Sequence, residues 1–313
     1  MDNPKAGSEP ITVVGSINRD IVVRCRSLPR AGETVAGSAL SYGSGGKGAN
    51  QAVAASRLGG TVRMIGRVGA DAWGRTARGV LRSAGCDISG VRQAGQLSGQ
   101  ALVTVDLQGA NSIVVIEAAN GLLSADQVRR DEKKLKEGGV ILLQLEIPLE
   151  AVSTAAMIAH SAGGRVILDP GPARDLPRDL LRRISVITPN RTELEVLTGR
   201  KKLSDGELVE AAEHLRSSGP ETVIAKLGAE GCLIIGDGPA RQLAAPHVDV
   251  VDTTGAGDVF NAALAVRLSE GAPIEAGVEF ALAAASLSVT RFGAQSAAPT
   301  RAEVVTFMQG TPT

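Results

Sequence analysis

Aromatic side chains and cysteines are both scarce in this sequence. Four phenylalanines, Tyr42 and Trp73 are its only Phe, Tyr or Trp residues among 313, which excludes an aromatic stacking platform and a tyrosine-rich binding surface. The three cysteines, Cys25, Cys86 and Cys232, lie far apart and form no Cys-x-x-Cys motif. We therefore expect buried, reduced thiols, and neither a disulfide framework nor a zinc site.

The sequence also lacks an excess of charge of one sign and any long apolar run. Its 33 basic and 33 acidic residues give a net charge of zero, and no basic stripe is present, which argues against nucleic acid or an anionic membrane as a partner. No stretch approaches the ~18 apolar residues that a membrane span requires. Residues 1–10 are polar and resemble neither a secretory signal nor an Arg-rich transit peptide, so we expect a cytoplasmic protein.

Short apolar runs rich in β-branched residues alternate with helical patterns along most of the chain. Continuous apolar runs are typical of strands buried on both faces of a parallel sheet, so the alternation predicts an α/β fold with a mostly parallel central sheet flanked by helices. The expected strands are 11–17, 62–68, 140–145, 166–169, 186–188 and 222–226, and the expected helices are 47–58, 72–84, 124–136, 149–161, 205–218, 255–270, 273–291 and 301–308. No linker or internal repeat is visible, so we expect one domain over residues 1–313.

Two segments, 21–42 and 99–116, do not follow this pattern because their polar and apolar residues alternate. Alternation is typical of strands with one covered face and one free face, which are usually antiparallel. The segments therefore form either a small β layer beside the main sheet or ordinary surface hairpins.

Glycine is abundant, at 38 of 313 residues against an ordinary share of ~7%, and it clusters before expected helices. The first cluster, 43–50, contains Gly-x-Gly-x-x-Gly, and Asp71 follows roughly twenty residues later, as in dinucleotide-binding sites. The preceding segment is too polar for a central strand, and Gly48 stands where a phosphate P-loop needs Ser or Thr. A polar-ligand site that presents backbone N–H groups, Lys47 and Asn50 therefore remains open beside a dinucleotide site and a plain turn.

The second cluster is Asp-Thr-Thr-Gly-Ala-Gly-Asp at 252–258, directly before an expected helix. The N–H groups of Gly255, Ala256 and Gly257 can point at one spot there, where the helix dipole also favours negative charge, and so form an anion hole. Asp258 beside it is either a capping residue or a general base that takes a proton from a hydroxyl group.

A third pattern is Asn190 and Glu193, three residues apart at an expected helix start. The pair is either a capping box, with Asn190 as N-cap, or an amide and a carboxylate that hold Mg²⁺ through its waters. An anion hole, an adjacent acid and a Mg²⁺ shell together favour phosphoryl transfer to a hydroxyl group, because that reaction depends mostly on positioning and charge stabilisation. These residues alone name no substrate.

Five long motifs occur in an order that resembles the PfkB sugar-kinase family, over about residues 11–300. They are Gly-Ser-Ile-Asn-Arg-Asp at 15–20, Pro-Arg-Ala-Gly-Glu-Thr at 29–34, Gly-Gly-Lys-Gly-Ala-Asn-Gln-Ala at 45–52, Thr-Pro-Asn-x-x-Glu at 188–193 and the 252–258 cluster. Gln-Leu-Glu-x-Pro-Leu-Glu at 144–150 and Val-Thr-Arg-x-Gly-Ala-Gln at 289–295 are similar to the ribokinase branch. The resemblance implies a ribokinase-like α/β fold with a discontinuous β lid from about 19–44 and 96–117, and a homodimer that packs lid against lid.

The resemblance also implies the reaction, which is the ATP-dependent phosphorylation of the 5-hydroxyl of D-ribose. Asp258 would be the general base beside the anion hole of Gly255, Ala256 and Gly257. The residues implied to contact the sugar are Asn18, Asp20, Gly46, Lys47, Asn50, Glu146 and Asp258. Those implied to lie along ATP are Asn190, Lys226, Leu227, Gly228, Ala229, Glu230, Gly231, Gly257 and Asp258, with Asn190 and Glu193 at Mg²⁺ through water.

A monovalent-cation site, typically for K⁺, is also implied beside the anion hole. Its matching positions are Asp252, Thr254, Ser288, Arg291 and Gly293, mostly through backbone carbonyls. A sixth position departs from the family pattern, because Ala297 stands where a serine hydroxyl is expected; Ser296 or water would have to replace it. Ser44 is a second departure, since a larger or apolar residue is expected there near the sugar.

Three other functions remain as alternatives. They are a related kinase acting on another pentose, fructose or a nucleoside, a non-catalytic sugar-binding regulator, and an NAD(P)-binding oxidoreductase. The scarcity of aromatic rings argues against a nucleoside, whose base needs an apolar, often aromatic wall.

Overall fold

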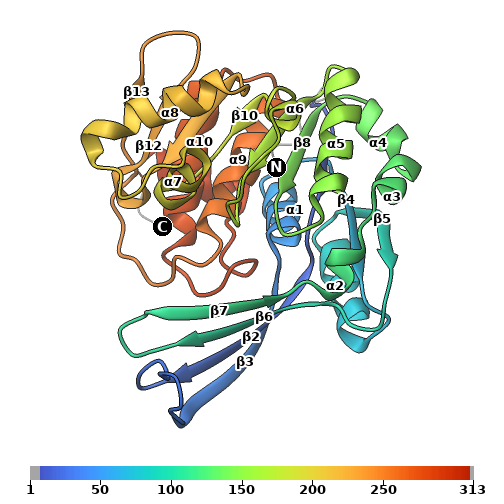
Figure 1. Cartoon of the computed structure of the whole chain (residues 1–313), viewed down its shortest axis with the longest axis vertical. Coiled ribbons are helices and arrows are strands. Elements are labelled where there is room, and N and C mark those ends of the chain that lie inside the picture. Colours follow the sequence, from blue (N-terminus) through green and yellow to red (C-terminus); the bar gives the residue numbers. More distant parts are fainter. Residues whose placement is uncertain (1–7, 311–313) are drawn as a thin grey trace.

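The computed structural model describes residues 8–310 and contains two β-sheets (Figure 1). The larger sheet, here called the main sheet, has nine strands in the order β13-β12-β11-β10-β9-β8-β1-β4-β5. They are β1 (Ile11–Val14), β4 (Val62–Val68), β5 (Asp87–Gln93), β8 (Val140–Gln144), β9 (Arg165–Asp169), β10 (Val186–Ile187), β11 (Thr222–Lys226), β12 (Cys232–Ile235) and β13 (Arg241–Leu243).

All neighbouring pairs from β11 to β5 run parallel, as the apolar runs predict. β12 and β13 add an antiparallel edge that the sequence analysis did not anticipate. Alternate residues of a strand enter opposite cores: in β8, Leu142 packs into one hydrophobic cluster and Ile141 and Leu143 into the other. The helices therefore form a layer on each face of the main sheet.

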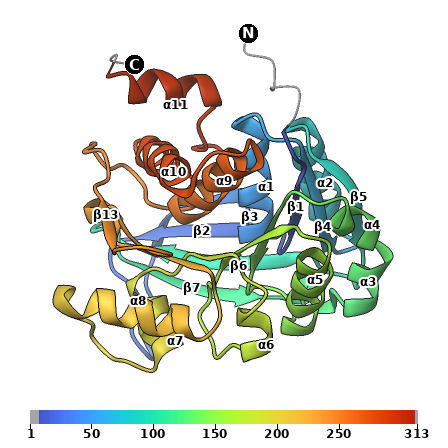
Figure 2. The same cartoon turned by 90° about the horizontal axis from the view of Figure 1, so that it is seen from above.

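Figure 2 shows these two layers from above. One is α1 (Lys47–Arg57), α2 (Ala72–Ser83), α9 (Ala256–Ser269), α10 (Ile274–Ser288) and α11 (Arg301–Met308). The other is α3 (Ala125–Arg130), α4 (Glu132–Lys136), α5 (Leu149–Ser161), α6 (Arg178–Leu181), α7 (Arg191–Thr198) and α8 (Leu208–Ser217).

The expected helices are all present, with one correction. The helix expected at 124–136 is divided into α3 and α4 at Asp131. The buried carboxylate of Asp131 accepts hydrogen bonds from Arg92 and Lys134, and Lys134 Nζ lies 2.9 Å from Asp131 Oδ1. The break therefore places an ion-paired carboxylate between the two short helices.

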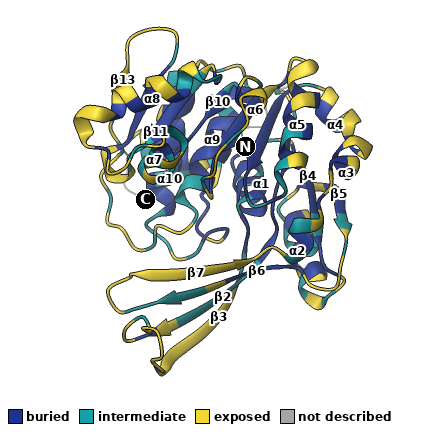
Figure 3. Ribbon diagram, viewed as in Figure 1, coloured by how far each residue is buried: buried dark blue, intermediate teal, exposed yellow. Residues whose placement is uncertain are grey.

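The two alternating segments form one four-stranded sheet, which we call the lid. Its strands are β2 (Asn18–Cys25), β3 (Gly37–Gly45), β6 (Gly99–Val105) and β7 (Asn111–Ile116), in the order β3-β2-β6-β7. This confirms the predicted β layer over separate surface hairpins. Figure 3 shows the contrast between the buried main sheet and the exposed strands β3 and β7.

The expectation of an antiparallel lid is wrong for its central pair. β2 and β6 run parallel, with Asn18 opposite Gly99, while β2–β3 and β6–β7 are antiparallel hairpins. The reason lies in the connections: β2 follows β1 and β6 follows β5, and β1 and β5 belong to the parallel part of the main sheet. Both hairpins consequently leave the main sheet in the same direction.

Two further expectations concern the cysteines and the membrane. Cys25, Cys86 and Cys232 are free and buried, as expected, and burial raises the pKa of the Cys232 thiol to about 12. Within residues 8–310, the helices are all too short or too polar to cross a bilayer. Most of the polar segment 1–10, on which the cytoplasmic expectation rests, lies outside the described residues.

Candidate active site

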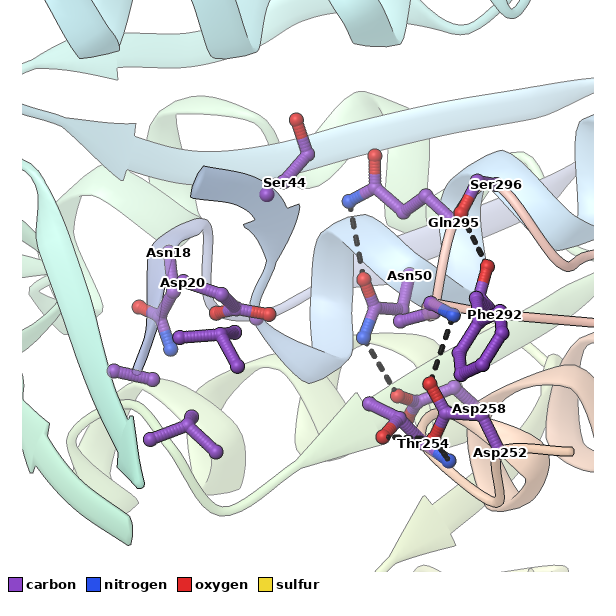
Figure 4. Close-up of a pocket in the computed structure, with 18 of the residues that line it drawn as sticks. Asn18, Asp20, Ser44, Asn50, Asp252, Thr254, Asp258, Phe292, Gln295 and Ser296 are labelled. Atoms are coloured by element: carbon purple, nitrogen blue, oxygen red, sulfur yellow. Dashed lines mark hydrogen bonds between the residues drawn. The ribbon is translucent and has the colours of Figure 1, made fainter. Parts of the chain in front are cut away.

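A cavity of about 1440 Å³ lies between the lid and the main domain. It brings together residues that the sequence analysis assigned to the sugar, to the base and to the cation. Those that line it are Asn18, Asp20, Gly46, Lys47, Asn50, Glu146, Asp252, Thr254, Gly255, Asp258 and Gly293. In Figure 4, Asn18 and Asp20 approach from one side, while Asn50 and Asp258 lie on the other.

The first glycine turn joins lid strand β3 to helix α1. Gly46 has a φ of +86°, which glycine adopts without strain. A β-carbon on Gly48 would lie 2.6 Å from the carbonyl carbon of Gly15, so α1 can start against the end of β1 only with glycine there. The dinucleotide interpretation is wrong, because the preceding strand belongs to the lid, and Asp71 caps α2 by accepting a hydrogen bond from Gly74 N.

Asp258 is buried in the first turn of α9. The N-cap of this helix is Gly255, at a φ of +77°, and no side chain caps it, so the capping interpretation of Asp258 is not supported. Its carboxylate instead accepts hydrogen bonds from Asn50 Nδ2, at 2.9 Å, and Gln51 Nε2, at 3.1 Å. Burial raises the pKa of Asp258 to about 6, with Lys47 opposing the rise. A carboxylate with such a pKa suits a general base near neutral pH.

Asp20 and Glu146 bring two more carboxylates to the cavity. Burial raises the pKa of Asp20 to about 7, and the neighbouring Glu146 and Asp258 add to the rise. Glu146 Oε2 accepts hydrogen bonds from Ser16 Oγ at 2.6 Å and from Lys47 N at 3.1 Å. This part of the cavity is therefore rich in acceptors, as hydroxyl groups of a sugar would require.

Asn18 is held by a residue that the sequence analysis missed. Asn120 Nδ2 donates to Asn18 Oδ1 at 2.6 Å, and Asn120 Oδ1 accepts from Ile17 N at 2.9 Å. Asn120 is buried in the short 3-10 helix η1 (Ala118–Leu122), directly after lid strand β7. No local pattern distinguishes it, because its role depends on contact with residues about a hundred positions away.

Asp169 is the largest omission of the sequence analysis. It is fully buried at the end of β9, where its carboxylate binds Lys226 Nζ at 3.1 Å and Lys47 Nζ at 3.2 Å. Gln51 Nε2 also donates to it at 3.2 Å. Burial acts to raise the pKa of Asp169, but the two lysines outweigh it and hold that pKa below its usual value.

A general signal for Asp169 was present in the sequence. Carboxyl ends of parallel strands meet at one edge of a sheet, and ligands bind in α/β proteins at that edge. Asp169 is the last residue of β9, and Lys226 is the last residue of β11. Aligning the expected strands by their carboxyl ends would have placed the two side chains together.

Asn190 and Glu193 form the predicted capping box at the start of α7. Asn190 Oδ1 accepts from Glu193 N, and Glu193 Oε2 accepts from Asn190 N, both at 2.8 Å. The second carboxylate oxygen, Glu193 Oε1, and Lys47 Nζ would lie 2.8 and 2.9 Å from a β-carbon on Gly171. Glu193 Oε1 therefore lies on the same side of the site as Lys47, and it remains able to accept a hydrogen bond outside the capping box.

The predicted nucleotide segment after β11 does not line the cavity. It forms the 3-10 turn η3 (Gly228–Glu230), in which Leu227 N donates to Gly231 O at 2.8 Å. This turn also contains Ala229. Lys226, just before it, reaches back toward the predicted anion hole, because a β-carbon on Gly257 would lie 3.5 Å from Lys226 Nζ.

The predicted cation positions lie on two loops that Asp252 joins and, for Ser288, at the end of α10. Asp252 Oδ1 accepts from Thr254 N at 2.9 Å, and Asp252 Oδ2 accepts from Gly293 N at 2.9 Å. Ser288 and Arg291 lie at the end of α10 and just after it, and Arg291 N donates to the Ser288 carbonyl at 3.2 Å.

The two departures from the family pattern lie on different elements, Ala297 after α10 and Ser44 in lid strand β3. Ala297 is buried and offers only a methyl group, while the Ser296 hydroxyl donates to the Phe292 carbonyl at 2.9 Å. Ser44 lines the cavity.

The chain matches the model of the family described as "pfkB family carbohydrate kinase" over residues 8–301. It is 40% identical over 300 residues to a ribokinase of Haemophilus influenzae, covering 96% of this chain and 98% of that protein. It is 35% identical over 291 residues to a deoxyribokinase of Salmonella typhi, covering 92% of this chain and 95% of that protein.

A solved structure of similar fold is Arabidopsis thaliana ribokinase complexed with ribose and ATP. It superimposes with a TM-score of 0.88 at 35% identity, covering 96% of this chain and 99% of that chain. This chain therefore has the ribokinase-like α/β fold. The motifs, the fold and these relatives together show that the chain belongs to the pfkB family of carbohydrate kinases.

Proposed function

We propose that the protein phosphorylates the 5-hydroxyl of D-ribose with ATP, giving D-ribose 5-phosphate and ADP. One observation carries the proposal: Asp258 is a buried carboxylate of raised pKa at a helix N-terminus, in a cavity that also presents Asn18 and Asp20. The ribokinase relatives, including the one bound to ribose and ATP, support this choice of substrates.

The chemistry assigned to these residues follows from their positions. Asn18 and Asp20 bind sugar hydroxyls, with Glu146, Lys47, Asn50 and the Gly46 backbone as further contacts. Asp258 takes the proton of the 5-hydroxyl while the oxygen of that hydroxyl attacks the terminal phosphoryl group of ATP and ADP leaves. The N–H groups of Gly255, Ala256 and Gly257 stabilise the charge on that group, for which Ala256 N has to leave its 3.2 Å hydrogen bond to the Thr253 carbonyl.

The nucleotide side of the site is formed by Asn190, Glu193, Lys226 and the segment 227–231. In the described part of the chain, no group of three or more His, Cys, Asp or Glu side chains could hold a metal ion directly. Glu193 nevertheless keeps one oxygen free of its capping box, which fits Mg²⁺ bound through water and ATP phosphates. Mg²⁺ would neutralise phosphate charge there.

A coupled ADP-release assay tests the function across ribose, deoxyribose, fructose and adenosine. We expect ribose to give the highest kcat/KM. Turnover of adenosine without turnover of ribose would reject the proposal, and deoxyribose as the best substrate would assign the chain to the activity of the Salmonella relative. Sugar binding without ADP release would identify a regulator.

We also propose a monovalent-cation site at Asp252, Thr254, Ser288, Arg291 and Gly293. The donor set is mostly backbone carbonyl oxygen, and Asp252 holds its two loops together, which fits a K⁺ ion. We expect K⁺ to activate turnover more than Na⁺, and Ala297→Ser to increase that activation because it adds a hydroxyl ligand. Rates in matched KCl and NaCl solutions measure this, and equal rates would contradict it.

A homodimer through the lid completes the proposal. The lid exposes large apolar side chains that a second copy would cover: Leu40, Tyr42, Leu102, Val114 and Ile116. Light scattering is expected to give twice the chain mass, and Val114→Glu is expected to lower it because the substitution buries a charge in the interface. A wild-type protein of single-chain mass would contradict the dimer.

A further inference from the structure

Two chains of side-chain amides converge on the carboxylate of Asp258. On one side, Gln295 Nε2 donates to Asn50 Oδ1 at 3.0 Å, and Asn50 Nδ2 donates to Asp258 Oδ2 at 2.9 Å. On the other side, Gln144 Nε2 donates to Gln51 Oε1 at 2.6 Å, and Gln51 Nε2 donates to Asp258 Oδ1 at 3.1 Å. Each carboxylate oxygen therefore receives one amide, and a glutamine stands behind each amide. Figure 4 shows Asn50 between Gln295 and Asp258.

All five side chains are buried or nearly so. Gln144 and Gln295, which we call the outer glutamines, each leave their Oε1 buried without a hydrogen-bond partner among the described residues. A buried unpaired acceptor is costly, so the orientation of these glutamines has to be required by something else.

The requirement comes from the direction of the hydrogen bonds. A side-chain amide has a donor end and an acceptor end, and an ionised carboxylate only accepts. Asn50 must therefore turn its NH₂ group to Asp258, and Gln51 must turn its NH₂ group to Asp258 and Asp169. Both residues then turn their oxygens outward. If the amide group of Gln295 or Gln144 rotated by 180°, its oxygen would face the oxygen of Asn50 or Gln51. The repulsion between the two oxygens would favour rotation of that inner amide as well, which would bring its oxygen against the Asp258 carboxylate.

We propose that Gln144 and Gln295 are positioning residues of the reaction, which orient Gln51 and Asn50 so that Asp258 is held ionised and in one position. The inference rests on the proposed role of Asp258 as the general base. The two chains also reach Asp258 from different elements, since Gln144 ends β8 and Gln295 lies in the loop after α10. Each chain can therefore be disrupted separately.

The electrostatic surroundings show why neutral donors matter here. The charged groups around Asp258 are Lys47 of α1, Asp169 of β9, Lys226 of β11, Asp20 of β2 and Glu146 after β8. Burial and Asp169 raise the pKa of Asp258, while Lys47 and the hydrogen bonds from Asn50 and Gln51 lower it. Because hydrogen bonds to a charged carboxylate favour its ionised form, loss of one amide is expected to raise this pKa further.

The test replaces each outer glutamine by methionine, which has a similar length and no amide. The pH dependence of kcat is measured with saturating sugar and ATP, so that it reports groups in the complex. Neither variant removes a donor to Asp258 itself, but each frees Asn50 or Gln51 to turn its NH₂ group away from the carboxylate. We therefore expect the acidic limb to move to higher pH in Gln295→Met and in Gln144→Met, by at most about one unit, the size of one hydrogen bond to a charged group. Turnover at high pH should recover toward the wild-type value.

Gln127→Met is the matched control. Gln127 is a buried glutamine whose Oε1 also lacks a partner within the described residues, but its Nε2 donates to the carbonyls of Gly66 and Gly90, away from the cavity. We expect Gln127→Met to lower thermal stability without moving the acidic limb. The contrast separates an effect on Asp258 from the general loss of a buried amide.

Two outcomes would overturn the inference. One is folded Gln295→Met and Gln144→Met enzymes with the wild-type acidic limb, and the other is an equal displacement in Gln127→Met. Gln295 lines the cavity from the loop after α10, outside the main sheet, so its variant decides the matter if Gln144→Met does not fold. Failure of the proposed function would look different, because the wild-type protein itself would then show no turnover of any sugar.

Discussion

Asp258→Asn is expected to lower turnover by about 10²–10⁴, the usual contribution of general acid–base catalysis, while sugar and ATP still bind. The change keeps the shape of the side chain and removes its ability to accept a proton. In the wild type, Asn50 and Gln51 both donate to the carboxylate. In the variant, the NH₂ group of one of them would face the NH₂ group of the substituted side chain, and that hydrogen bond would be lost. Single-turnover kinetics measure the loss, and calorimetric titration with ribose measures binding.

The matched control for this prediction is Asn50→Asp, which alters a neighbour of Asp258 and leaves the base in place. We expect a smaller loss of turnover that is partly recovered at higher pH, where Asp258 is ionised. Wild-type turnover in Asp258→Asn would show that Asp258 is not the base, and loss of sugar binding would show that it mainly holds substrate.

Asp169→Ala is expected to lower the free energy of unfolding by about 3 kcal/mol at pH 7, the scale measured when one partner of a buried ion pair is removed. Asp169 is fully buried, and the side chains of Lys47 and Lys226 are 27% and 15% exposed, so the variant leaves two poorly solvated ammonium groups close together. Urea denaturation measures the change. Asp237→Ala is the control, because Asp237 pairs with Arg216 while almost fully exposed, and we expect no measurable change there.

The contacts of Asp169 with the two lysines also make stability depend on pH. The lysines hold the pKa of Asp169 below its usual value, so its contribution to stability is complete above the unfolded-state value of about 4 and is lost as the pH falls through the folded-state pKa. The difference in unfolding free energy between wild type and Asp169→Ala should therefore shrink in acid. A difference that stays constant from pH 7 to pH 3 would contradict the assigned ion pair.

The parts of the fold that the sequence predicts are those with local causes. The continuous apolar run of β8 predicts a strand buried on both faces, and the alternation in β6 predicts a lid strand. β13 has only three residues, too few to show a period. The parallel pairing of β2 with β6 depends on how each strand leaves the main sheet, and alternation within a strand carries no information about that.

The candidate site divides in the same way. The glycine turn before Lys47 and the Asn190–Glu193 capping box are local patterns that can be read directly. Gln51 and Gln295 belong to two of the motifs that carry the family resemblance, at 45–52 and 289–295, but those motifs assign no role to either glutamine. Their roles arise from contacts with Asp258 and Asn50 across more than two hundred residues, which no short pattern contains.

The parallel pairing at the centre of the lid has a mechanical consequence. Asn18 and Gly99 lie opposite each other at the base of the two hairpins, so a rigid lid that swings would pivot near this line. Displacement in a rotation grows with distance from the axis, so the hairpin tips would travel far while Asn18 and the nearby Asp20 move little. A lid that swings in this way would keep the proposed sugar contacts of Asn18 and Asp20 close to its pivot, so that opening the cavity would not displace a sugar bound there.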